Sequence, residues 1–200
     1  MNRLDLAWIR VRLGQHEPRA IAASLAPRRA AVACIFRNST RSPELLFIRR
    51  SRQEHDPWSG HVAFPGGLVE PDDASPLHTA RRETLEEVSI DLAECADLLG
   101  RLDDIIASAK GRVLPMAITP HVFALHAPIS PHINRSEVEE LLWVPASMLL
   151  DPAYASTHPY ELGGERYELP CFRVFDRVIW GLTYQMLLRL FVVLDWEPAR

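Results

Sequence analysis

Three glutamates, Glu83, Glu86 and Glu87, lie close together near the middle of the chain. If this segment is helical, Glu83 and Glu87 stack on one face because they are four residues apart, and Glu86 borders the same face. Converging carboxylates suit magnesium or manganese, which prefer oxygen ligands. The alternative is a solvated acidic face of a surface helix, and the spacing alone leaves both interpretations open.

The segment that precedes these glutamates contains Phe64-Pro65-Gly66-Gly67 at the end of a predicted strand, and a loop follows. Two adjacent glycines permit backbone conformations that are closed to other residues, and they let the backbone approach a ligand closely. A carbonyl oxygen there could add one more ligand to a metal. A tight turn is the alternative explanation for Gly66-Gly67.

A helix is predicted directly after that loop. Ser75 can cap it, and Pro76 suits the first helical position. Small or apolar residues then recur at spacings of three or four, which indicates one buried face: Leu77, Ala80, Thr84 and Val88. The same helix also carries the three glutamates.

The stretch from Gly67 to Ile90 resembles the Nudix box, the signature of Nudix hydrolases. It departs from the usual pattern in three places: Asp73 stands for Glu, Ser89 stands for Gly, and one extra residue lies between Asp73 and Arg82. The three glutamates are intact. Ser89 would lie just beyond the helix end, where a positive φ costs a serine about 1 kcal/mol.

The altered box resembles one Nudix branch, the coenzyme A pyrophosphatases. Upstream, residues 45–50 (LLFIRR) and 59–67 (SGHVAFPGG) are similar to a second signature of that branch. Here the loop between them is longer, and Asp56 stands near a position where the signature has Arg. Trp143-Val144-Pro145 and Trp180-Gly181-Leu182-Thr183 are similar to later family landmarks, so the resemblance extends loosely over residues 30–195.

The resemblance implies a metal site and a fold. Glu83 and Glu87 would be the primary ligands of Mg²⁺ or Mn²⁺, with Glu86 on a second metal or acting through water and the carbonyl of Gly66 or Gly67 completing the site. Asp73 would pair with Arg82 and hold the loop against the helix. The implied architecture is a Nudix-type α/β/α sandwich with a mixed central sheet, in the α+β class.

A general base and the phosphate-binding residues are less firmly indicated. Glu137, Glu139 and Glu140 precede Trp143, near where many Nudix enzymes bring in a further acid, and Glu137 is the candidate catalytic residue; an exposed acidic run is the alternative. The candidate substrate-binding residues are Arg49, Arg50, Arg52 and His61, with His55 in the same loop. Each of them could also be an ordinary polar surface residue. Trp58 could stack on a base or pack in the core.

The implied activity is metal-dependent hydrolysis of a phosphoanhydride bond in a nucleoside-diphosphate-linked metabolite. The branch implies coenzyme A or an acyl-CoA, cleaved to 3′,5′-ADP and a 4′-phosphopantetheine. ADP-ribose, NADH and dinucleoside polyphosphates are alternative substrates within the family. A nucleotide-binding regulator without activity is a different class, and it predicts loss of Glu83 or Glu87, both of which are present.

The remaining elements mix strands and helices without regular alternation, which favours an α+β fold. Residues 1–28 are expected to form an N-terminal helical arm, and residues 29–195 the Nudix hydrolase domain. The predicted strands are 30–36, 44–49, 61–64, 98–106 and 113–125, one that ends at residue 145, and a hairpin of 154–160 with 165–169 around Gly163-Gly164. The other predicted helices are 4–13, 146–150 and about 180–194.

Composition and charge limit the kinds of binding partner that we expect. The 200 residues are 48% hydrophobic, enough for one core, and the formal net charge of −4 gives no reason to expect nucleic-acid or anionic-membrane binding. We expect a small nucleotide-type substrate, and a homodimer stays open. Charges in residues 4–13 argue against a signal peptide, and residues 178–194 are short for a membrane span. Three scattered cysteines favour a reducing compartment, the cytoplasm.

Overall fold

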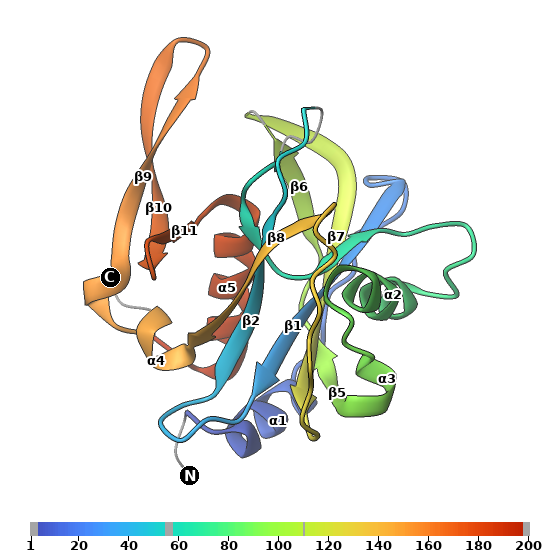
Figure 1. The fold of residues 1–200 in the computed structure, drawn as a ribbon. Helices are drawn as coiled ribbons and strands as arrows, with labels where there is room; N and C mark the ends of the chain where they lie inside the picture. The colour runs from blue at the N-terminus through green and yellow to red at the C-terminus, as the bar shows by residue number, and fades with distance from the viewer. Residues whose placement is uncertain (1–3, 55–57, 110, 198–200) are drawn as a thin grey trace.

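The structure, a computed structural model, describes residues 4–54, 58–109 and 111–197 (Figure 1). His55 and Asp56 lie outside the described residues. The helices are α1 (Leu6–Gly14), α2 (Pro76–Val88), α3 (Leu92–Cys95), α4 (Ala146–Leu149) and α5 (Gly181–Leu194), with a 3-10 turn at Pro152–Tyr154. The strands are β1 (Arg28–Arg37), β2 (Glu44–Arg50), β3 (Val62–Ala63), β4 (Gly66–Leu68), β5 (Ala96–Arg101), β6 (Ile105–Ala109), β7 (Arg112–Leu125), β8 (Val138–Pro145), β9 (Ala155–Leu162), β10 (Glu165–Val174) and β11 (Arg177–Ile179).

The main sheet is mixed, as expected. Its backbone path runs β3-β2-β1-β7-β5, with β4 on β1, β6 on β7 and β8 on β2. β1 and β7 are parallel from the pair Arg28 and Met116 to the pair Phe36 and Ala124, and the other neighbours are antiparallel. Parallel strands need cover on both faces, which explains why β1 is a nearly continuous apolar run.

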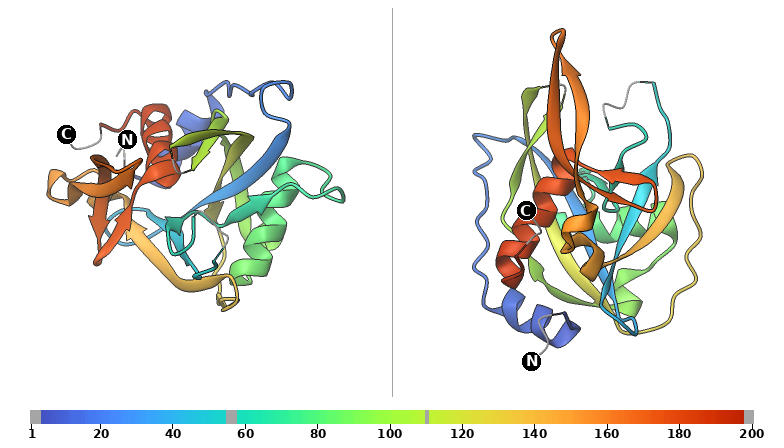
Figure 2. Two further views of the ribbon diagram at one scale, coloured as in Figure 1. Left: turned by 90° about the horizontal axis from the view of Figure 1, so that it is seen from above. Right: turned by 90° about the vertical axis from the view of Figure 1, so that its left-hand side faces the viewer.

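Helices cover both faces of this sheet, so the α/β/α layering is confirmed. Successive side chains of a strand point to opposite faces. On β1, Val32 and Phe36 join the core beneath α1 and α5, whereas Ala33 and Ile35 join the core beneath α2. Figures 1 and 2 show α2 and α3 on one side of the sheet and α5 on the other.

The expected N-terminal helix is present, and it packs on the end of α5. Ile9 and Leu13 are buried in the same core as the α5 side chains. Trp8 Nε1 donates to the carbonyl of Leu194 at 2.7 Å, and Arg12 Nε donates to that of Val193 at 3.1 Å. The first helix and the last helix therefore stabilise each other, although the boundary drawn at residue 28 stays a prediction.

Two strand predictions were wrong. The strand expected over 98–106 is divided into β5 and β6, because Asp104 between them turns inward. Its buried carboxylate accepts hydrogen bonds from Ile21 N at 2.9 Å, Arg29 Nη1 at 2.9 Å and Thr119 Oγ1 at 2.8 Å. The strand expected over 61–64 is present as β3 and ends before Pro65, but Gly66-Gly67, where no strand was expected, begins a further strand, β4, which pairs with β1.

The passage from β3 to β4 positions the site. β3 pairs with β2, whereas β4 pairs with β1, so the chain crosses between these two strands at Phe64 and Pro65. Pro65 O accepts a hydrogen bond from Ala33 N at 2.8 Å, and Val62 O accepts one from Thr183 Oγ1 at 3.0 Å. The crossing is thus fixed to β1 on one side and to α5 on the other.

The second sheet holds β9, β10 and β11. β9 and β10 form the predicted hairpin, joined by Gly163 and Gly164, whose φ values of +62° and +86° suit glycine. Figure 1 shows this hairpin projecting from the body of the molecule. In the described ranges, no helix is both long and apolar enough to cross a bilayer.

Candidate active site

The predicted acidic helix is confirmed as α2. Ser75 Oγ accepts a hydrogen bond from His78 N at 3.2 Å, and Pro76 occupies the first turn. Ala80, Thr84 and Val88 are buried. The helix ends at Ser89, which has left-handed geometry with φ +56° and ψ +37°. This buried face fixes the rotation of α2 and hence the direction in which its glutamates point.

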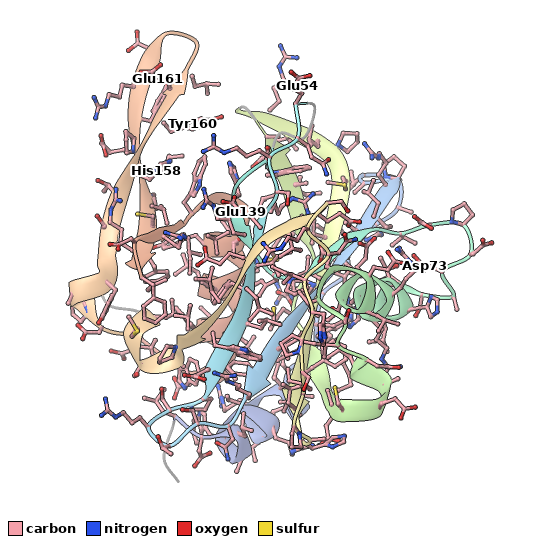
Figure 3. The ribbon with its side chains drawn as sticks, viewed as in Figure 1. Glu54, Asp73, Glu139, His158, Tyr160 and Glu161 are labelled. Carbon is pink, nitrogen blue, oxygen red and sulfur yellow. The ribbon has the colours of Figure 1, made fainter. Side chains whose placement is uncertain are left out.

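Asp73 ties the loop after β4 to this helix, as the resemblance implied. Its side chain is almost fully buried and accepts hydrogen bonds from Arg82 Nε at 3.1 Å and Nη2 at 3.0 Å, and from Thr79 Oγ1 at 2.8 Å. The Arg82 guanidinium holds the pKa of Asp73 well below its usual range. Figure 3 labels Asp73 beside α2. Arg82 Nη1 also lies 3.0 Å from Glu83 Oε1, which orients that carboxylate.

Glu83 and Glu87 of α2 meet Glu137, which directly precedes β8. One carboxylate oxygen from each lies within 4.8 Å of the others. The side chain of Glu87 is 1% exposed and that of Glu83 is 13% exposed. A cluster formed by two separate elements and largely withdrawn from water is not the solvated acidic face that the spacing had left open.

Burial raises the pKa of Glu87 to about 8 and also raises that of Glu83. The groups that oppose this effect at Glu87 are the Gly66 N–H, which donates to Oε2 at 2.9 Å, and Arg50, whose Nη1 lies 3.8 Å from Oε1. Three clustered carboxylates are therefore incompletely neutralised by the protein itself. An all-oxygen set of this kind fits Mg²⁺ or Mn²⁺.

The two glycines of β4 are required by close contacts rather than by a turn. A side chain on Gly66 would overlap the carbonyl of Ala31, and one on Gly67 would overlap the carboxylate of Glu83. α2 packs on one face of the sheet, yet its glutamates line a cavity whose other walls include Val32 on the opposite face. The missing side chains of β4 leave room for Glu83 at this point.

The cavity has a volume of about 460 Å³. Glu83, Glu87 and Glu137 line it together with Arg50 and Arg28, and most of the remaining lining residues are apolar. Its other lining residues are Ala30, Val32, Trp58, His61, Ala63, Phe64, Gly66, Gly67, Leu68, Leu114, Met116, Ile118, Trp180, Leu182, Thr183 and Met186. The glutamate cluster and Arg50, whose Nη1 lies 3.8 Å from Glu87, mark the charged end of the cavity.

Of the other predicted site residues, some line the cavity and others lie outside it. Arg50 and His61 line the cavity. Arg49 instead pairs with Glu139 at 3.1 Å, and Arg52 does not line the cavity. The side chain of Glu86 is 49% exposed and pairs with Arg82 at 3.1 Å, outside the three-carboxylate cluster.

Sequence reasoning missed several cavity residues. Arg28 and Met116 meet only because β1 and β7 pair in parallel, a long-range register that no local pattern reveals. Trp180 and Leu182 carried a signal, because both belong to the later family landmark. Trp58 packs partly against the core and also lines the cavity, so both of its proposed environments are present.

The comparisons with known proteins agree with this geometry. A NUDIX domain model matches residues 27–162. An uncharacterised Schizosaccharomyces pombe protein is 33% identical over 98% of this chain and 64% of its own length. The human mitochondrial coenzyme A diphosphatase NUDT8 is 34% identical over 78% of this chain and 65% of its own length. The uncharacterised Nudix hydrolase NudL of Pectobacterium atrosepticum is 35% identical over 78% of each.

The chain therefore spans less than two thirds of the length of the S. pombe and human proteins. The domain match nevertheless covers most of this chain and includes β4, α2 and Glu137. Of the three glutamates in the stretch that resembles the family signature, Glu83 and Glu87 line the cavity, whereas Glu86 lies outside the cluster. The chain belongs to the Nudix hydrolase family.

Proposed function

We propose that this protein hydrolyses the diphosphate of coenzyme A or an acyl-CoA, giving 3′,5′-ADP and a 4′-phosphopantetheine. The proposal of hydrolytic activity rests on the cluster of Glu83, Glu87 and Glu137 at the charged end of a mostly apolar cavity. The substrate class rests on the upstream signature at residues 45–67 and on the 34% identity to a protein named as a coenzyme A diphosphatase.

Glu83 and Glu87 would hold the metal, with Glu137 close beside them. When bound, Mg²⁺ or Mn²⁺ neutralises phosphate charge and lowers the pKa of water. The rest of the catalysis falls to the chain itself. The Gly66 N–H orients Glu87, and Arg82 orients Glu83. Fixed carboxylates of this kind lose little energy to reorganisation during the reaction.

Glu137 and Arg50 have further roles in this proposal. Glu137 comes from a different element than the α2 glutamates, and it is the candidate to accept the proton of the attacking water. Arg50 faces the same end of the cavity and offers a guanidinium to a phosphate oxygen. Arg28, on the first residue of β1, is a second cation at the cavity wall. Arg49 is the weaker candidate, because it pairs with Glu139 and does not line the cavity.

The test is a substrate panel with product identification by mass spectrometry, with and without exhaustive chelation. We expect CoA and acyl-CoA to be cleaved at the diphosphate and the activity to disappear on chelation. Dephospho-CoA, which lacks only the 3′-phosphate, should show a kcat/KM roughly tenfold lower if a charge-assisted contact recognises that group. A much higher kcat/KM for ADP-ribose, NADH or a dinucleoside polyphosphate would refute the substrate, and full activity after chelation would refute the metal site.

We also propose a reducing compartment, the cytoplasm, as the location. Cys34, Cys95 and Cys171 are all free thiols, and two of them are buried. The compartment of relatives varies, since one of them is named as mitochondrial. Fractionation of cells that express the full-length protein, with detection by antibody, tests this directly.

A further inference from the structure

A second cleft of about 420 Å³ lies between the β9–β10 hairpin and the start of α5. It shares four lining residues with the catalytic cavity: Trp58, His61, Trp180 and Leu182. The two spaces are therefore neighbours, and a long ligand whose diphosphate lies at the glutamates could extend into the cleft.

Trp180 lines both the cleft and the catalytic cavity. Its ring lies 4.7 Å from that of His61, 4.7 Å from that of His158 and 5.4 Å from that of Tyr160, centroid to centroid. His61 belongs to the loop before β3, whereas His158 and Tyr160 belong to β9. Figure 3 labels His158 and Tyr160 on the hairpin. This aromatic cluster joins the hairpin to the catalytic cavity.

The hairpin presents one face to the cleft. Tyr167 pairs with Tyr160 across the two strands, and Leu169 lies two residues farther along, so all three side chains point the same way. Arg166 and Glu168 point to the other face, where they pair at 3.4 Å. Gly111, just before β7, lies against the hairpin tip, where a side chain at this position would overlap Leu162.

The cleft differs from the catalytic cavity in charge. Among its described lining residues there is no Asp, Glu, Lys or Arg, and the polar groups are Ser108, Gln185 and His61 besides the tyrosine hydroxyls. The catalytic cavity has Arg28, Arg50 and three glutamates. A phosphate placed against these described residues would lose water without gaining a cation from them, which is costly. An uncharged, partly apolar group would instead gain by leaving water.

We propose that this hairpin cleft binds the uncharged pantetheine and acyl portion of an acyl-CoA, while the phosphorylated nucleotide occupies the charged end of the catalytic cavity. The inference rests on the proposed function, because only a substrate with one charged half and one neutral half matches both spaces. The domain match ends at residue 162, so Tyr167, Leu169 and α5 lie beyond it. These residues adapt the shared catalytic core to a particular substrate.

Leu169→Asp tests the inference by adding a charge to the neutral cleft. We expect kcat/KM for octanoyl-CoA to fall at least about tenfold through KM, and that for CoA to fall less, since the acyl chain gains most from apolar walls. Leu169→Ala should lower the octanoyl-CoA to CoA ratio in the same direction. The matched control is Arg166→Ala on the opposite face of the same strand, which should leave both values within about twofold of wild type.

An uncharged probe supplies the second measurement. S-octanoyl-pantetheine, which has no nucleotide, should inhibit octanoyl-CoA cleavage by the wild-type enzyme and should inhibit the Leu169→Asp variant much less. Inhibition by 3′,5′-ADP should be equal in both. Melting temperatures of all variants show whether they fold.

The two proposals fail differently. If the wild-type protein cleaves neither CoA nor acyl-CoA, the proposed function is wrong and the cleft proposal is overturned with it. If it cleaves both but Leu169→Asp leaves their ratio unchanged in a folded protein, only the cleft proposal is wrong. A variant that loses inhibition by 3′,5′-ADP and keeps that by S-octanoyl-pantetheine would show that the cleft binds the nucleotide instead.

Discussion

One segment lines the catalytic cavity and another lines the hairpin cleft, and they hold their side chains in different ways. Residues 66–89 are fixed by charge: Asp73 binds Arg82, Arg82 contacts Glu83, and the Gly66 N–H binds Glu87. Residues 155–174 are fixed by backbone pairing and by packing of His158 and Tyr160 on Trp180. The first segment can hold a charged transition state rigidly, whereas the second offers neutral surface.

We therefore expect the two segments to contribute differently, the first to the rate of the reaction and the second to the choice of substrate. A small displacement of a catalytic carboxylate reduces turnover sharply, because the groups must be aligned with the reacting atoms. A side chain that only adds apolar contact changes affinity by a modest factor. Mutations in residues 66–89 should therefore change kcat, and mutations on the inner face of the hairpin should change KM.

The largest effect is expected for Glu87→Gln, which keeps the size of the side chain and removes its charge. Turnover should fall by more than ~100-fold, the scale of a lost central electrostatic contact. In metal-free buffer at pH 7 the variant should melt at or above the wild-type temperature. Burial raises the pKa of Glu87, so the charged form is disfavoured in the folded protein and its removal costs no stability.

Glu86→Gln is the matched control on the same helix. Its side chain is half-exposed and pairs with Arg82 rather than with the cluster, so turnover should fall by less than about tenfold. Steady-state kinetics at saturating Mg²⁺ measure both variants. If Glu87→Gln and Glu86→Gln lose turnover equally, the cluster is not the whole metal site, and Glu86 would have to be a metal ligand as well.

Substitutions at two glycines, one in each segment, test the same difference between the segments. In Gly67→Ala the new methyl group meets the flexible end of Glu83, so the carboxylate must move while the fold accommodates the change. Turnover should fall roughly 10- to 100-fold, the cost of a displacement near 1 Å, with little loss of melting temperature. The measurement is kcat together with thermal unfolding.

Gly164→Ala in the hairpin turn should behave in the opposite way. No atom lies within 4 Å of the new methyl group, but φ is +86°, which strains any other residue. Stability should fall by about 1 kcal/mol while kcat is unchanged. If Gly67→Ala costs stability and spares turnover, the close contact at Glu83 has no catalytic importance.

Much of the first segment could be predicted from sequence, because its signals are local. The cap at Ser75, the buried face of α2 and the Asp73 to Arg82 pair follow from residues close together in the chain. The predictions failed where distant residues decide the outcome. Asp104 breaks a strand because it binds Ile21, Arg29 and Thr119, and Gly66-Gly67 continues as a strand because β1 lies beside it.

The hairpin was predicted as a structure but not as a functional element. Gly163-Gly164 between two short strands is a local signal. The position of its inner face over Trp180 depends on β11, which pairs with β10 and leads into α5. Such packing joins residues that no motif connects, so the cleft could be found only from the fold.

Asp73→Asn should lower stability by about 2 kcal/mol at pH 7, because it removes the buried charge that pairs with Arg82 and leaves that guanidinium only Glu83 and Glu86 as charged partners. The difference from wild type should shrink below pH ~4, near the ordinary pKa of an aspartate. There the unfolded wild-type chain takes up a proton at Asp73 while the folded form, whose pKa is lowered by Arg82, does not, so the wild type loses stability as the pH falls. Urea unfolding at pH 7 and at pH ~3 measures this. A difference independent of pH would mean that the carboxylate charge is not what holds the loop.

The smallest effect is expected at the end of α2, and it is a gain. Ser89 has a φ of +56° where glycine is common, and its N–H closes the helix on the carbonyl of Leu85 at 2.9 Å. Ser89→Gly should relieve the strain, an effect opposed by the greater freedom of glycine in the unfolded chain, for a net gain of up to about 1 kcal/mol. Thermal unfolding measures the gain, and Ser130→Gly, at an exposed position between β7 and β8, serves as a control for adding a glycine. A lower melting temperature for Ser89→Gly alone would mean that the serine side chain stabilises the helix end. The stabilisation by this side chain would then outweigh the backbone strain that a serine has at this position.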